Sequence, residues 1–498
     1  MAPRLKPGYL WLAALWFYWW TRLHNLGALP VFLDEAAHIW WARLAWDWQP
    51  FHAASDGRLL NVLWASVFWP FSGSVWVARA ATVLLTTVGF AALLAFARRF
   101  LEPPAAAVTA VTYTLVPFAL FFERMQLPDV YATACAILLL WSSAELARSP
   151  RRRGDKVLTA IALAAGLLSK LTSLVFVPVP ALAALVFGHR ARWRVHARAT
   201  LHAYLLAASL LLPVLVVLRI IARSDLGLDL LARKTAGSPA EMWVQAKMTG
   251  PMTWIFFRTL FTPWLWWPGL AAIAIALWQR AQASLYVCAI ALFGLLPLIA
   301  KSSTGFLEAR FALPYVALLI LLMAAGASAL WQPVVRAVTP VRIVVVTLAL
   351  LTLFPGAQFM SKAFSQPAAL ELPWRDEWEY ISGWPSGYGF REIATQYHAH
   401  GQPQRLLTFD LGGQQRLAAY LPPDSAVTPV WVPPDKFAAA LVSTPGSAPT
   451  LLVLDHPKDD ADLATLELDL RPLQRYTRPG GESWLTVYDL GVAASGSD

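Results

Sequence analysis

Acidic side chains stand close together in the segment 32–47, which follows the first long apolar run of the chain. Asp34 and Glu35 are adjacent, and His38 follows Glu35 at the spacing of one helical turn. A carboxylate in such a segment can take a proton from an attacking hydroxyl group, whereas Asp34 as an N-cap and Glu35 in the first turn could simply stabilise the start of a helix. Glu35 and His38 could share a divalent metal, but two ligands do not define a site. Asp34 and Glu35 are therefore the candidate catalytic residues, and a metal is left open.

Later segments also carry charged side chains, most of them cationic, next to apolar runs. Arg124 and Asp129 lie in a short turn between apolar runs, Lys170 interrupts a long stretch of apolar and small residues, and Lys301 and Arg310 precede a late apolar run. Arginine binds phosphate as a bidentate fork, and lysine binds it as a point charge. Two of these residues have an alternative role: Lys170 could snorkel to the membrane surface, and Asp129 could cap the helix that follows it. We expect all five residues to bind the substrate.

Composition identifies the environment of these residues. Of 498 residues, 57% are hydrophobic and only 14% are charged, whereas a soluble protein has about 25% charged residues. Cys135 and Cys288 both lie in apolar runs, which excludes a disulfide scaffold. The net charge of +10 lies largely in short loops, so it indicates membrane orientation and no nucleic-acid partner. The sequence predicts an integral membrane protein.

Long apolar segments cover most of residues 1–359. Each is close to the roughly 20 residues that cross a bilayer, and there are about eleven of them. The candidate spans are 8–24, 75–97, 104–122, 130–147, 157–171, 173–187, 199–222, 259–278, 284–300, 311–330 and 342–359. The first span lacks a small-residue cleavage site, so we interpret it as a retained helix and not a signal peptide.

Arginine and lysine alternate between the two ends of these spans. The basic segments 98–99, 148–156 and 190–198 belong on the cytoplasmic side together with the N-terminus. The loop 25–74, with an interfacial helix beginning near Glu35, then lies outside. The acids and cations named above thus come from separate loops on one outer face of a plasma (inner) membrane protein. Their convergence is the main functional signal in the sequence.

Residues 360–498 have the composition of a small soluble α/β domain. An odd number of spans with the N-terminus in the cytoplasm places this domain outside the membrane. Strands are predicted at 406–410, 451–455 and 484–489, and a helix at 389–400. Acids follow these strands, but no glycine-rich phosphate loop accompanies them. An accessory role in holding the acceptor or covering the site is therefore expected.

Several short motifs together resemble the GT-C glycosyltransferases. They are the acidic pair at Asp34, the Arg-x-x-x-Pro-Asp sequence at 124–129, the segment 166–170, and the sequence 310–314 that opens a late helix. The closest similarity is to the bacterial branch of the protein O-mannosyltransferase and aminoarabinose transferase superfamily (glycosyltransferase family 39-like). Segment 379–389 also looks like one found in bacterial members. The family's usual sequence after the loop helix is replaced here by residues 56–61, which leaves the acceptor side open.

The resemblance implies a membrane-embedded all-α GT-C domain and a sugar donor carried on a polyprenyl phosphate. Asp34 matches the family's catalytic position, with Glu35 beside it, and family members differ in metal dependence. Transfer to a hydroxyl of a lipid, glycan or protein acceptor is then expected outside the membrane, usually with inversion at the anomeric carbon. Two alternatives remain open: a transporter or flippase of lipid-linked sugars, and a non-catalytic protein whose external domain binds a cell-wall partner.

Overall fold

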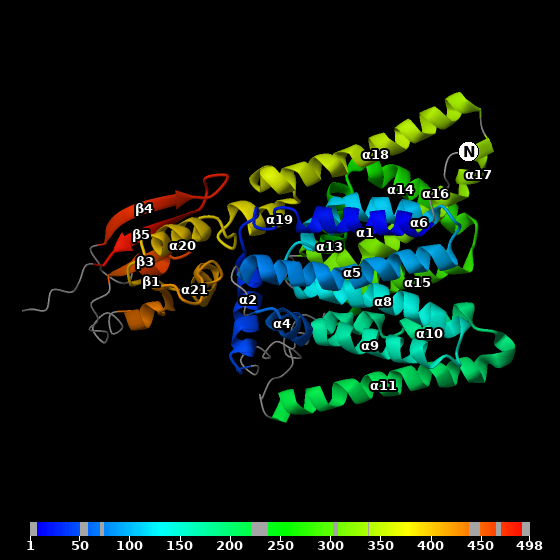
Figure 1. Cartoon of the computed structure of the whole chain (residues 1–498), viewed down its shortest axis with the longest axis horizontal. Helices are drawn as coiled ribbons and strands as arrows, with labels where there is room; N and C mark the ends of the chain where they lie inside the picture. The colour runs from blue at the N-terminus through cyan, green and yellow to red at the C-terminus, as the bar shows by residue number, and fades with distance from the viewer. Residues whose placement is uncertain are drawn as a thin grey trace, which may run out of the picture.

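A computed structural model describes residues 7–49, 58–69, 74–220, 238–301, 307–336, 338–437, 449–464 and 470–490. A body of long, roughly aligned helices makes up most of the molecule, and a small α/β domain lies at one end of it (Figure 1). The helices of the body are α1 (Pro7–Leu23), α5 (Ser74–Phe100), α6 (Ala105–Leu115), α7 (Pro117–Phe122), α8 (Pro128–Arg148), α9 (Arg153–Ser169), α10 (Val179–Phe187), α11 (Trp193–Ile220), α13 (Pro239–Leu260), α14 (Pro263–Trp278), α15 (Gln282–Lys301), α16 (Leu313–Ala329), α17 (Trp331–Arg336) and α18 (Thr339–Ser365).

Five stretches of helix in the described residues are long and apolar enough to cross a membrane, or six if one bent pair is a single span. The five are Ser74–Phe100, Pro128–Arg148, Arg190–Ile220, Ala309–Ala329 and Arg342–Ser365. The bent pair is Ala240–Leu260 with Pro263–Trp278, at 110° to each other. The protein is therefore a multi-pass membrane protein, and the expected total of eleven crossings is not confirmed.

Breaks in the helices explain much of the difference between the two counts. The predicted span 104–122 is divided into α6 and α7 because Val116 is extended and precedes Pro117, and an extended residue before proline commonly ends a helix. The predicted spans 157–171 and 173–187 meet at Lys170, whose extended backbone (φ −162°, ψ 133°) ends α9 and is followed by a 3₁₀ segment, η1 (Leu171–Phe176). The sequence thus predicted the boundary near Lys170 to within two residues, but it did not predict the break at Val116.

Two short helices lie at the end of the body nearest the α/β domain: α2 (Leu33–Trp46) and α4 (Leu59–Ser66). In Figure 1, α2 lies across the ends of the long helices, between them and the α/β domain. The expected helix of this loop is thus present, beginning at Leu33, and its position at the membrane interface stays a prediction. One side of it is buried, including Ala36, Ile39 and Ala42.

The α/β domain is built on a five-stranded mixed sheet with strand order β2-β1-β3-β5-β4. Strands β2, β1 and β3 are parallel, and β5 runs antiparallel to both β3 and β4. The elements are α20 (Phe390–Ala399), β1 (Gln404–Thr408), α21 (Leu411–Ala418), β2 (Val427–Trp431), η6 (Pro434–Lys436), β3 (Thr450–His456), α23 (Asp460–Ala464), β4 (Arg471–Thr477) and β5 (Trp484–Asp489).

The predicted helix and the three predicted strands are all present in this domain. The sequence prediction missed β2 and β4, which are the two edge strands. Strand β2 contains Pro429, which is tolerated at a sheet edge, and β4 is largely exposed, so neither has the apolar run of a buried strand.

A linking segment joins α18 to this domain. It contains η4 (Pro367–Ala369), α19 (Trp374–Glu377) and a π-helical turn, η5 (Trp378–Ser382). Helix α18 itself continues past residue 359 to Ser365. Asp376, Tyr380 and Ile381 of the linking segment are almost completely buried, which fixes the segment against the helical body.

Candidate functional site

Asp34 lies in the first turn of α2. The residue at the N-cap position is Phe32, which makes no side-chain capping hydrogen bond, so the capping role considered for Asp34 is not observed. The Asp34 carboxylate instead accepts a hydrogen bond from Arg310 Nη2, at 2.7 Å from Oδ2. Arg310 belongs to η3 (Ala309–Ala312), the 3₁₀ turn before α16. Two residues that are far apart in sequence thus meet at the end of the helical body.

Arg310 is surrounded by further carboxylates. Glu308 forms an ion pair with it, and Glu379 Oε1 of the linking segment lies 3.4 Å from Nη2. The Arg310 guanidinium also lies near the rings of Phe32 and Phe311. Its Nε has no hydrogen-bond partner among the described residues, so one donor of this buried cation is free.

A second ion pair lies beside the first. Lys170 Nζ is 2.5 Å from Asp129 Oδ1, and both side chains are largely buried. The same Nζ is 4.2 Å from the centre of the Phe311 ring. Because Phe311 also contacts Arg310, one aromatic ring lies against both cations. The structure therefore brings together Asp34, Asp129, Lys170 and Arg310.

Exposure separates the three candidate carboxylates. The Asp34 side chain is 39% exposed, the Asp129 side chain 7%, and the Glu35 side chain 0%. A general base must come within hydrogen-bond reach of its substrate's proton. Of these three, Asp34 alone can be reached without rearrangement of the protein.

Charges near Asp34 control its ionisation. Burial raises the pKa of Asp34, but the guanidinium charges of Arg310 and Arg58 outweigh burial and lower the pKa to about 2. Burial and the adjacent Arg58 guanidinium lower the pKa of His38 to about 3, so its imidazole is neutral. At neutral pH Asp34 is an ionised, proton-accepting carboxylate.

The linking segment adds two acids that sequence reasoning did not place at the site. Burial raises the pKa of Glu379, and Glu308 and Asp34 raise it further, although Arg310 opposes them. Burial, followed by the charges of Glu379 and Glu308, raises the pKa of Asp376 well above its ordinary range. Within the described residues neither carboxylate oxygen of Asp376 has a hydrogen-bond partner. Asp376 therefore holds its proton at neutral pH, whereas Glu379, with a pKa of about 7, is only partly protonated there.

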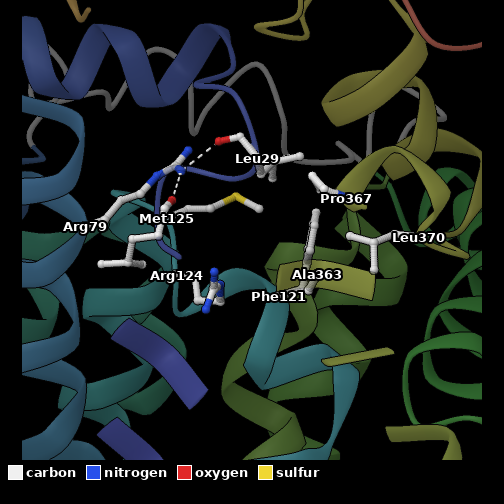
Figure 2. Close-up of a pocket in the computed structure, with 9 residues that line it drawn as sticks. Leu29, Arg79, Phe121, Arg124, Met125, Ala363, Pro367 and Leu370 are labelled. Carbon is white, nitrogen blue, oxygen red and sulfur yellow. Dashed lines mark hydrogen bonds between the residues drawn. The ribbon is translucent and has the colours of Figure 1, made fainter. Parts of the chain in front are cut away.

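Glu35 points away from this cluster. Arg79 of α5 donates to both of its carboxylate oxygens, at 2.8 and 2.7 Å, and the main-chain N–H of Gln126 donates to Oε1 at 2.9 Å. Arg79 also donates to the carbonyls of Leu26 and Leu29, at 2.5 and 2.8 Å (Figure 2). The fully buried pair thus ties the chain entering α2 to α5 and to the turn before α8. We propose that Glu35 has a structural role.

This interpretation predicts a loss of stability when the Glu35 pair is broken. Glu35→Gln should lower the free energy of unfolding by about 3–5 kcal/mol, because it leaves a buried guanidinium without its counterion. Thermal unfolding in detergent measures this loss. Asp47→Asn is the control, because the Arg43–Asp47 pair is exposed to solvent and its charged atoms are 3.9 Å apart. Unchanged unfolding combined with lost activity would instead return Glu35 to the catalytic group.

The proposed metal pair receives no support from its surroundings. His38 Nε2 lies 3.3 Å from Arg58, and Glu35 is occupied by Arg79. No group of three or more His, Cys, Asp or Glu side chains among the described residues could hold a metal ion.

Arg124 is also apart from the cluster. Its guanidinium donates to the carbonyls of Thr21, Arg22 and Asn25, at 2.9, 3.3 and 3.0 Å, and so satisfies the C-terminal end of α1. It lines a pocket that also includes Arg79 and Phe121 (Figure 2). Lys301 is the last residue of α15, and its side chain lies outside the described part of the chain.

Four residues of the cluster were not selected from the sequence: Arg58, Glu308, Asp376 and Glu379. Arg58 stands in the segment that departs from the family pattern, and Glu308 stands two residues before Arg310. Both could have been suspected from their positions. The burial of Glu379 against Arg310 depends on how residues 374–382 fold back onto the membrane domain, and no local pattern predicts it.

Comparison with known proteins shows which proteins share this fold. The model of the dolichyl-phosphate-mannose-protein mannosyltransferase family matches residues 62–217. No curated protein sequence matches the chain. ArnT from Cupriavidus metallidurans in the apo state is 14% identical with a TM-score of 0.62, and the match covers 99% of each chain.

Two further solved structures contain lipid phosphates. ArnT from the same organism bound to undecaprenyl phosphate is 13% identical, with a TM-score of 0.61 over 98% of this chain and 99% of that one. The archaeal oligosaccharyltransferase AglB from Archaeoglobus fulgidus, with an inhibitory peptide and a dolichol-phosphate, is 11% identical; its TM-score is 0.52 over 95% of this chain and 73% of that one. The chain therefore has the fold of the GT-C glycosyltransferases and is similar to the protein mannosyltransferase family.

Proposed function

We propose that the protein transfers a sugar from a polyprenyl-phosphate donor to a hydroxyl acceptor on the extracytoplasmic side of the plasma membrane. The observation that carries this proposal is the half-exposed, ionised Asp34 next to two cations, Arg310 and Lys170. The lipid phosphates bound to ArnT and AglB, which share the fold, support the donor class. The acceptor is a hydroxyl group of an envelope lipid, glycan or protein.

The geometry supports a single-displacement reaction. Asp34 takes the proton of the acceptor hydroxyl, whose oxygen forms a bond to the anomeric carbon of the sugar. The bond between that carbon and the phosphate oxygen breaks, and polyprenyl phosphate leaves with the bonding electrons. Arg310 and Lys170 offset the negative charge that develops on the phosphate. Attack opposite to the leaving group inverts the anomeric configuration.

The charges of the site favour catalysis over transport of the intact lipid. Asp34, Lys170 and Arg310 lie in short or irregular segments at helix ends, near the α/β domain. Cleavage of the donor is the direct test. Purified protein should release polyprenyl phosphate from a labelled polyprenyl-phosphate sugar when a hydroxyl acceptor is present, whereas a flippase would move the donor intact.

Sidedness is tested separately. We propose eleven crossings with the N-terminus in the cytoplasm, because basic residues alternate between loops and the α/β domain follows the last span. A cysteine at Asp424, an exposed residue of that domain, should react with a membrane-impermeant thiol reagent in intact cells. A cysteine at Arg151 in the opposite loop should react only after lysis, with Cys288→Ala as the background. The reverse pattern would contradict both the orientation and the extracytoplasmic site.

A further inference from the structure

The N-terminus of α2 is held by the α/β domain and not by its own helix. Leu33 N–H is one of the first-turn donors that have no partner within a helix, and it donates to the carbonyl of Pro385 at 2.9 Å. Two residues earlier, the N–H of Val31 donates to the Tyr420 hydroxyl at 2.6 Å. Asp34 directly follows Leu33, so the backbone next to the proposed base is bonded to residues more than 300 positions away.

Close packing reinforces these hydrogen bonds. A Cβ at Gly387 would meet the carbonyl oxygen of Val31 at 2.0 Å, so only glycine permits this approach of the two backbones. A Cβ at Gly412, in the first turn of α21, would meet Leu33 Cδ1 at 2.1 Å. The side chain of Leu33 therefore fits against the start of α21.

Pro385 is itself held from inside the α/β domain. We call residues 382–387 the docking loop. Arg416 of α21 donates to the carbonyls of Trp384 and Ser386, at 2.6 and 3.1 Å. Ser483 donates to the carbonyl of Ser382 at 2.5 Å, at the beginning of the loop.

A buried carboxylate orients the arginines at this loop. Asp455, at the end of β3, accepts from Arg478 at 2.7 and 3.0 Å and lies 3.4 Å from Arg416. All three side chains are at most 3% exposed. We call this trio the Asp455 clamp. A buried pair of this kind is rigid only while both partners are present, because removing one leaves an uncompensated charge.

We infer that the Asp455 clamp is a positioning device for Asp34, acting through the docking loop and the Pro385 to Leu33 hydrogen bond. This inference rests on the proposed function and adds the reason why a membrane glycosyltransferase of this kind needs its α/β domain. The π-helical turn η5, which ends at Ser382 where the docking loop begins, places Glu379 against Arg310 and Tyr380 against Phe32. The clamp thus positions Asp34 and also Glu379, which lies against Arg310.

The test removes one clamp arginine in the full-length protein. In Arg478→Met, the amide of Leu33 should exchange hydrogen at least about ten-fold faster, because its acceptor is no longer fixed. The kcat of sugar transfer should fall by about 10²-fold with little change in the donor KM, since a displacement of about 1 Å can cost that much. Arg478→Lys should recover part of both effects.

Arg475→Met is the matched control. Arg475 lies on β4 of the same sheet, stacks on Trp484 and does not contact the docking loop, so Leu33 exchange and kcat should stay at wild-type values. Ser483→Ala is the milder second variant if Arg478→Met exposes the whole sheet to exchange. Slow Leu33 exchange in both Arg478→Met and Ser483→Ala, or fast exchange with unchanged kcat, would overturn the inference. Fast exchange in a protein whose wild type transfers no sugar would instead reject the proposed function.

Discussion

Asp34→Asn is expected to lower the kcat of sugar transfer by about 10³-fold or more while leaving the protein folded. General-base catalysis contributes about 10²–10⁴-fold, and the substitution removes the proton acceptor with almost no change in size. Asp34 is ionised at neutral pH because Arg310 and its neighbours hold the pKa at about 2. Loss of rate on acidification from pH 7 to pH 5 is therefore expected to come from groups other than Asp34.

The control for this variant lies on the same helix. Asp47 follows the end of α2, is half-exposed and pairs only loosely with Arg43, so Asp47→Asn should keep wild-type turnover. Binding of polyprenyl phosphate should be retained in both variants. If Asp34→Asn turned over at a near-normal rate, the base would have to be sought among Asp129 and Glu35.

Lys170→Met is expected to reduce kcat/KM for the lipid donor by about 10²-fold, because loss of a positioned donor to developing negative charge costs about 10²–10³-fold. Lys170 meets Asp129 at 2.5 Å and shares the Phe311 ring with Arg310, so it is held at the site and does not extend toward the surface. Full activity of the variant would favour the alternative of a snorkelling lysine.

A second substitution separates binding of phosphate from neutralisation of Asp129. Lys170→Met/Asp129→Asn removes the stranded carboxylate as well as the lysine. The double variant should be as impaired as Lys170→Met, whereas recovered activity would show that the lysine serves only Asp129. Lys362→Met is the control. Lys362 also forms an ion pair, with Glu371 at 2.7 Å, but this pair is exposed to solvent.

Much of the fold could be predicted because apolar length and alternation are local properties. The long spans, the interfacial helix and the predicted strands all have such patterns. The boundary near Lys170 was also predicted, whereas the break at Val116 and the edge strand β4 depend on how segments pack, and the sequence shows little of this. The number of crossings consequently remains a prediction.

Residue type predicted which charged side chains lie together better than it predicted the direction in which each one points. Asp34 and Glu35 are neighbours in sequence, but successive residues of a helix point about 100° apart. One therefore faces Arg310 and the other is buried against Arg79. Arg124 has the residue type of a phosphate ligand, yet it satisfies the end of α1. The role of such a residue can be assigned only when the side chains that it contacts in the folded protein are known.

The most direct test of the central claim follows both parts of a labelled donor at once. Wild-type protein in proteoliposomes is given a polyprenyl-phosphate sugar labelled in the sugar, together with lipid, glycan and protein fractions of a cell envelope. We predict that label appears on a hydroxyl group of one fraction in amounts equal to the polyprenyl phosphate released, and that Asp34→Asn yields neither product. Movement of intact donor across the bilayer without cleavage, or equal transfer by Asp34→Asn, would contradict the account.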